Sequence, residues 1–128
     1  MKIEVVSRYD VALLKSAPDK VFVFGDNLIR RGTAGQAVIR HEPNAFGVPT
    51  KRFPSMTSNA FFSDQPDERE AVITALRDLY ALGRSRIIVF PSSGLGTGLA
   101  QMSHRSPSIY EEMTRVLKEH FGFIQGVA

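Results

Sequence analysis

The residues best suited to chemistry lie in a glycine-rich segment that follows an apolar run at 87–90. After Pro91 the chain has three glycines within five positions, Gly94, Gly96 and Gly98. Glycine lets main-chain N–H groups converge on an anion because no Cβ stands in the way. The segment therefore predicts an anion-binding loop, and a flexible surface turn is the alternative. Its candidate contacts are Ser92, Ser93, Gly94, Leu95, Gly96, Thr97 and Gly98.

A second segment of the same form follows the apolar run at 21–24. It begins with Gly25-Asp26-Asn27 and continues through Arg30 and Arg31 into a turn of small residues. The turn leads into a predicted helix, and unpaired N–H groups at a helix start suit a phosphate. A tight loop without a ligand is the alternative. The candidate contacts are Asp26, Asn27, Gly32, Thr33, Ala34, Gly35 and Gln36.

The elements that position these segments alternate between strand and helix. Apolar runs predict strands at 3–6, 21–24, 46–49 and 87–90. Helical spacing and cap residues predict helices at 11–14, 37–40, 66–82 and 107–121. This alternation predicts an α/β fold of three layers, with a mixed, largely parallel sheet covered on both faces. Ligands of such sheets bind beyond the carboxyl ends of the strands, so the two loops together would form a cleft for a diphosphate.

Length, charge and residue usage narrow the classes of protein. The chain has 128 residues and a net charge of +3, which fits a single domain over 1–128. Six Lys and Arg stand against two acidic residues in 20–52, so the positive charge is local, as in an anion pocket. There is no cysteine, the three histidines lack ligand spacing, and no apolar stretch approaches a membrane span. We therefore expect a cytoplasmic protein with no bound metal, no cofactor and no membrane contact.

The order of these parts resembles that of macrodomains, which are ADP-ribose-binding α/β/α modules. The resemblance covers about residues 3–120 and rests on Asp10-Val11, Asn27, Val48-Pro49-Thr50-Lys51 and Gly94-Leu95-Gly96-Thr97-Gly98-Leu99. It is closest to the compact class that removes terminal ADP-ribose from acidic residues of proteins or from DNA bases. The Gly-Asp-Asn and Pro-Asn-Ala-Phe-Gly segments are also similar to phage and bacterial proteins without an assigned function.

The resemblance implies how an ADP-ribose ligand would lie. Asp10 would accept a hydrogen bond from the adenine amine, and Asn27 would face the distal ribose. One phosphate would lie against 32–37 and the other against 93–98. Asp10 also fits a simple helix cap and Asn27 a simple turn residue, so both structural interpretations stay open.

The resemblance also implies a reactive lysine. Lys51, which follows Thr50 at a strand end, would attack or orient the ribose C1″, and neighbouring Arg52 or Arg30 would lower its pKa. A solvated lysine at a strand end is the alternative. One position departs from the family, because Ala100 stands where the eukaryotic enzyme of this class has an Asp. The missing carboxylate puts hydrolysis in doubt, although Asp26 or Glu42 are candidates to replace it.

Three functions follow from these observations. The first is binding of ADP-ribose or a related adenine nucleotide, attached to protein or DNA or free, with cleavage of the glycosidic bond left open. The second is a non-catalytic module that senses or sequesters the nucleotide, which Ala100 favours. The third is a nucleic-acid-associated protein, which requires an exposed stripe made of Arg30, Arg31, Arg40 and Arg52.

Overall fold

The computed structural model describes residues 1–125 and contains one four-stranded sheet. Its strands are β1 (Ile3–Val6), β2 (Val21–Asn27), β3 (Ala45–Lys51) and β4 (Ile88–Pro91), in the spatial order β1-β4-β2-β3. Every strand pair in this sheet is parallel. The expected α/β class is confirmed, and the described sheet is parallel throughout rather than mixed. The antiparallel pairing in the described chain is an isolated bridge between Lys51 and Phe61.

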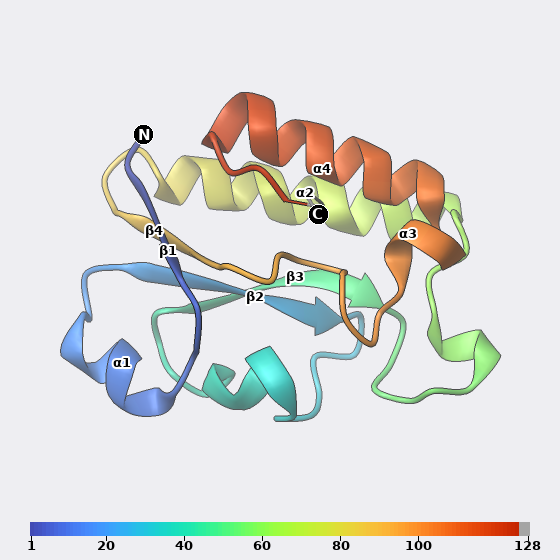
Figure 1. Ribbon diagram of the computed structural model, residues 1–128, viewed down its shortest axis with the longest axis horizontal. Helices are drawn as coiled ribbons and strands as arrows, with labels where there is room; N and C mark the ends of the chain where they lie inside the picture. Colours follow the sequence, from blue (N-terminus) through green and yellow to red (C-terminus); the bar gives the residue numbers. More distant parts are fainter. Residues whose placement is uncertain (126–128) are drawn as a thin grey trace.

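Helices cover both faces of the sheet (Figure 1). The long helices α2 (Pro66–Leu82) and α4 (Pro107–Phe121) lie side by side on one face. The short helix α1 (Val11–Ser16) and the 3-10 helix η1 (Gly35–Ile39) lie on the other face. This gives the expected three layers. None of the helices within residues 1–125 is long and apolar enough to cross a membrane.

Alternation along β2 explains why the sheet can be covered on both sides. Val21 and Val23 pack into the core beneath α2 and α4, whereas Phe22 and Phe24 pack against α1 and η1. Successive side chains of a strand point to opposite faces, so a continuous apolar run is buried only when both faces are covered. The run at 21–24 therefore indicates a three-layer fold by itself.

Several boundaries differ from the sequence-based expectation. β2 continues through Gly25 and Asp26 to Asn27, because these residues pair with β3. The predicted helix at 37–40 is the 3-10 helix η1, which begins two residues earlier. Two short elements were not expected, η2 (Ser58–Ala60) and α3 (Met102–Arg105), since neither is long enough to show a period in the sequence.

Candidate functional site

The carboxyl ends of β2 and β4 diverge and leave a crevice in the middle of the sheet. The two strands are paired at Val21 with Ile88 and at Phe22 with Val89. Beyond these pairs the hydroxyl of Tyr9 lies between the strands, 2.7 Å from the carbonyl oxygen of Val23 and 3.1 Å from that of Val89. A side chain from outside the sheet thus replaces the strand-to-strand hydrogen bonds where the crevice opens.

Gln36 holds the two glycine-rich loops together across this crevice. Its Oε1 accepts a hydrogen bond from the N–H of Gly25 at 2.8 Å. Its Nε2 donates to Ser93 Oγ at 3.1 Å and to the carbonyl oxygen of Gly94 at 2.9 Å. We call 28–36 the first loop and 92–101 the second loop. One side chain at the end of the first loop therefore fixes the start of the second beside it.

A small hollow of about 240 Å³ lies at this junction. It is lined by Gly35 and Gln36 from the first loop and by Ser93 from the second, and all three are predicted ligand contacts. It is also lined by residues after β1 and in β4 that the sequence analysis did not select: Ser7, Arg8, Tyr9 and Pro91. A signal for the first three existed, because they directly follow a parallel strand at the same edge. Arg8 adds a cation and Ser7 a hydroxyl to the hollow.

Several main-chain N–H groups of both loops have no hydrogen-bond partner in residues 1–125, and among their residues Gly96 and Ala100 are buried. Within residues 1–125, the N–H groups of 32–36 and of 96–100 donate no hydrogen bond to the protein. Gly32, Gly35, Gly94 and Gly96 all have a positive φ, a conformation that side-chain-bearing residues rarely adopt. Runs of free N–H groups next to such turns form concave anion sites. Both loops thus have the local backbone geometry that the glycines predicted.

The second loop is fixed from behind by the end of the described chain. Leu95 donates its N–H to Gln125 Oε1 at 2.8 Å and accepts at its carbonyl oxygen from Gln125 Nε2 at 3.0 Å. Thr97 turns its hydroxyl back to the carbonyl oxygen of Ser93 at 2.6 Å. The main chain of Leu95 and the hydroxyl of Thr97 therefore support the loop, while Ser92 and Ser93 remain exposed.

The first loop is braced by residues that were predicted to touch the ligand. Asn27 is buried, and its amide group bonds both the N–H and the carbonyl oxygen of Arg31. Asp26 is also buried and forms an ion pair of 2.6 Å with Arg40. The Arg40 guanidinium also donates to the carbonyl oxygen of Gly32 at 2.7 Å. Asp26 and Asn27 therefore shape the loop from below.

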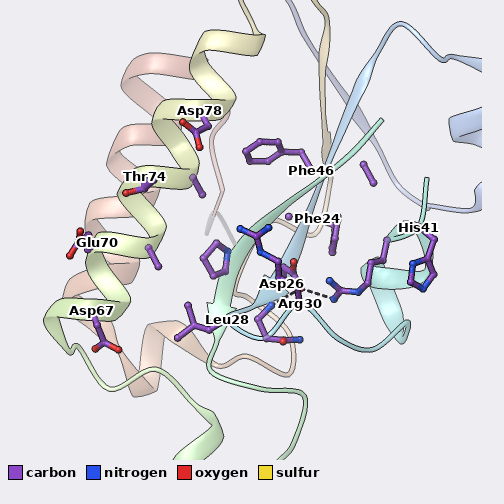
Figure 2. Close-up of a pocket in the computed structure, with 17 residues that line it drawn as sticks. Phe24, Asp26, Leu28, Arg30, His41, Phe46, Asp67, Glu70, Thr74 and Asp78 are labelled. Atoms are coloured by element: carbon purple, nitrogen blue, oxygen red, sulfur yellow. Dashed lines mark hydrogen bonds and ion pairs between the residues drawn. The ribbon is translucent and has the colours of Figure 1, made fainter. Parts of the chain in front are cut away.

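Figure 2 shows that the Asp26–Arg40 ion pair lies beside a second, larger hollow of about 840 Å³. This hollow follows the open edge of β3 and separates the first loop from α2. Helix α2 lines one side of it with Asp67, Glu70, Thr74 and Asp78. Apart from Asp26 and Asn27, it contains none of the predicted site residues. This second hollow is thus distinct from the crevice between the loops.

Two further predicted residues have structural partners. Asp10 caps α1, since its Oδ1 accepts a hydrogen bond from the N–H of Leu13 at 2.7 Å. Thr50 is buried and donates its hydroxyl to the carbonyl oxygen of Asp26 at 3.1 Å. The contact of Asp10 matches its interpretation as a helix cap, and its contact with adenine stays a prediction.

Lys51 lies at the end of β3, next to the base of the first loop. Its carbonyl oxygen accepts from the N–H of Leu28 at 2.9 Å, and its register partner in β2 is Asn27. Its Nζ donates to the carbonyl oxygen of Ser55 and lies 4.7 Å from the centre of the Phe61 ring. The lysine is therefore held in place and is more than a freely solvated side chain.

The pKa of Lys51 is lowered from its usual value, first by partial burial and then by the positive charge of Arg105. A lowered pKa was expected, but the two predicted neighbours are not its cause. Arg52 forms ion pairs with Glu68 at 2.7 Å and Asp67 at 2.9 Å. The cation that acts on Lys51 comes instead from α3, which follows the second loop. Sequence distance concealed this pair, because 54 positions separate its members.

The candidate carboxylates for assisting Lys51 are absent or already paired at two positions. Ala100, at the position where the enzyme class has an Asp, is buried in the core beneath α2 and α4. Of the candidate replacements, Asp26 is engaged by Arg40. No group of three or more metal-binding side chains exists in the part of the chain that the structure describes. The arrangement thus offers N–H groups, hydroxyls and cations, which suit an anionic ligand.

One family model matches the chain over residues 4–116, and its description is a family of unknown function (DUF7831). No curated protein and no solved structure matches the chain.

Proposed function

The chain belongs to the family of unknown function DUF7831, and we propose a function for it from the geometry of its site. We propose that it binds ADP-ribose or a related adenine nucleotide in the crevice between its two glycine-rich loops. The observation that carries the proposal is the bridge made by Gln36, which joins the end of the first loop to the start of the second beside one small hollow. A diphosphate has two adjacent anionic groups, and N–H groups at glycine-rich turns complement such groups.

The size and surroundings of the crevice support a ligand that is only partly enclosed. A hollow of about 240 Å³ is smaller than a typical pocket for a whole nucleotide, so the diphosphate occupies it and the two nucleoside ends extend over the rims. One end reaches towards Ser7, Arg8 and Asp10 after β1. The other follows the first loop, whose Gly32 lies near Pro54, towards Lys51.

Calorimetry with ADP-ribose tests the proposal, with ADP and ribose 5-phosphate as partial ligands. We expect saturable binding of ADP-ribose, weaker binding of ADP, and still weaker binding of ribose 5-phosphate, which lacks the diphosphate. Absence of detectable heat at millimolar ADP-ribose would rule the proposal out. Equal affinity for all three ligands would show that the diphosphate is not what the crevice recognises.

A second candidate function is cleavage of an ADP-ribosyl glycosidic bond, and the lowered pKa of Lys51 favours it. A lysine with a lowered pKa is more often neutral, and only the neutral amine can attack C1″ of the ribose. The burial of Ala100 favours the non-catalytic alternative. Incubation with an ADP-ribosylated peptide and an ADP-ribosylated oligonucleotide distinguishes the two: release of ADP-ribose that disappears in Lys51→Ala supports cleavage, and activity that survives the substitution refutes the lysine assignment.

The nucleic-acid alternative needed a free stripe of four arginines. Arg40 is paired with Asp26, and Arg52 is paired with Asp67 and Glu68. Arg30 and Arg31 are exposed. Two of the four cations are thus paired with carboxylates within the chain, which weighs against the nucleic-acid alternative.

A further inference from the structure

Three residues from different parts of the chain form a cluster at the far end of both loops. Lys51 ends β3, Phe61 follows η2, and Arg105 ends α3. The first loop starts beside Lys51, and the second loop leads directly into α3. The cluster is therefore separate from the crevice that Gln36 bridges, but the same two loops connect them.

Phe61 provides a rigid platform on which both cations rest. Its ring is buried, and its main chain forms an isolated bridge with Lys51. The Nζ of Lys51 lies 4.7 Å from the ring centre, and the guanidinium carbon of Arg105 lies 3.8 Å from it. Both distances are those of cation–π contacts. The two cations therefore lie close to one aromatic ring, although they come from β3 and α3.

The position of Arg105 is set by its own helix. Its Nε donates to Gln101 Oε1 at 2.9 Å. Gln101 begins α3 with a φ of 50°, a left-handed conformation that is uncommon for residues other than glycine. A backbone in an unfavoured conformation thus places the residue that orients the guanidinium. Such conformations persist where the surrounding structure over-determines them.

The positive charge of this cluster has no counterion in residues 1–125. None of the six ion pairs in that part of the chain includes Lys51 or Arg105. Asp64, three positions after Phe61, accepts hydrogen bonds from the N–H groups of Ser108 and Ile109, and Asp67 and Glu68 are paired with Arg52. Two like charges repel each other, and an anion bound between them would remove that repulsion.

We infer that Lys51, Arg105 and Phe61 form an oxyanion-binding site, for a phosphate ester or a carboxylate, that is distinct from the diphosphate crevice. The two cations donate charge-assisted hydrogen bonds to the oxyanion, and both contact the ring of Phe61. The pKa of Lys51 is lowered by its partial burial and then by the positive charge of Arg105, and a bound anion would offset the second of these causes. The site includes Lys51, towards which one nucleoside end of the proposed ligand would extend, but binding of a small oxyanion there does not depend on nucleotide binding in the crevice.

The experiment follows the Lys51 side chain by NMR in protein with ¹³C-labelled lysine, while inorganic phosphate or acetate is added at constant ionic strength. We expect a saturable shift of the Lys51 signal and a rise in the pKa of Lys51, because a bound anion favours the ammonium form. Lys118, exposed on α4, is the internal reference. A response to phosphate alone assigns phosphate esters, a response to acetate alone assigns carboxylates, and similar responses assign oxyanions in general.

Arg105→Gln supplies the matched variant. We expect it to weaken the response about tenfold, the cost of one charge-assisted hydrogen bond, and to raise the pKa of Lys51 without any anion, because it removes a neighbouring positive charge. Arg115→Gln, on the exposed side of α4, is the control and should change neither. The inference is wrong if the Lys51 signal follows that of Lys118 in the wild-type protein, a result that needs no variant to fold.

A further variant separates this site from the crevice. Gln36→Ala is expected to reduce ADP-ribose binding and to leave the phosphate response of Lys51 intact. If ADP-ribose fails to bind while Lys51 still responds, the proposed function fails and the oxyanion site stands. If ADP-ribose binds while Lys51 does not respond, the reverse holds.

Discussion

Single side chains, more than main-chain pairing, define the candidate site. The side chains of Tyr9 and Gln36 lie where β2 and β4 diverge, and both form hydrogen bonds with main-chain groups of these strands. Where a parallel sheet opens, its main-chain groups need other partners, because unpaired buried polar groups are costly. The two residues that satisfy the sheet therefore also line the hollow.

Gln36→Ala tests this dual role at the residue scale. Loss of its three hydrogen bonds should lower the free energy of unfolding by about 2 kcal/mol and weaken ADP-ribose binding about tenfold or more. Urea unfolding and calorimetry measure the two effects. Val38→Ala removes an exposed side chain from the same short helix and is the control. Unchanged affinity in Gln36→Ala would show that the loops keep their arrangement without the bridge.

Gly35, Gln36 and Ser93, which the sequence analysis selected, line the small hollow, whereas other selected residues have structural partners inside the fold. Asp26 and Asn27 follow a strand at the ligand edge, as binding residues do, yet both are buried braces of the first loop. Glu68, in the first turn of α2, was not selected, and it is a fully buried partner of Arg52. Residue type and position indicate that a side chain is polar and near the site; they do not indicate which way it points.

At the scale of elements, the start of helix α4 is capped by a residue that lies far away in the sequence. Helix α4 begins without a side-chain cap from its own neighbour Ser106. Asp64 replaces that cap from the loop before α2, with Oδ2 accepting from the N–H of Ser108 at 3.1 Å and Oδ1 from that of Ile109 at 2.9 Å. A negative charge at this end also complements the helix dipole. The start of α4, and through it α3, is thus tied to a loop 44 positions away.

Substitution of Asp64 should separate the hydrogen bonds of this cap from its charge. Asp64→Ala should lower the free energy of unfolding by about 1 kcal/mol or more. Asp64→Asn should cost less, because Asn keeps one acceptor oxygen and tolerates the positive φ of 57° at this position. Glu111→Ala, exposed on α4, is the control in urea unfolding. Equal losses for Ala and Asn would assign the effect to charge alone.

For the whole molecule, the change of stability at alkaline pH reports on the burial of Tyr9 between β2 and β4. Burial raises the pKa of Tyr9 well above its usual value of 10.0. The unfolded chain then loses the Tyr9 proton near pH 10 while the folded chain keeps it, so the stability that this residue contributes is complete below pH 10 and falls as the pH rises further.

Tyr9→Phe should remove that part of the alkaline loss of stability. We expect the wild-type protein to lose stability more steeply than Tyr9→Phe above pH 10, although the variant is less stable at neutral pH because it lacks the two hydrogen bonds of the hydroxyl. Thermal unfolding over a pH series measures both. Tyr80→Phe, whose ring is partly exposed, is the control. Parallel curves for wild-type protein and Tyr9→Phe would contradict the assignment.

The fold also decides how much of the positive charge in the sequence is free of a paired carboxylate. The sequence places an excess of positive charge in 20–52. In the fold, the buried Arg40 and the half-buried Arg52 are neutralised by carboxylates. Lys51 is paired in space with a cation from outside that window, Arg105. The charge available to a ligand therefore lies in fewer residues than the count suggests, and it lies at the ends of the two loops.

The sequence by itself determined the strands, the long helices, their three layers and the position of both glycine-rich loops at one edge of the sheet. These features depend on local periodicity and on glycine conformation, and both are set by residues that are close together in the sequence. Only the tertiary structure decided that Gln36 joins the loops, that Gln125 supports Leu95 and that Arg105 shares a ring with Lys51. Such contacts depend on the packing of whole elements, because residues 30 to 58 positions apart meet only once the chain is folded.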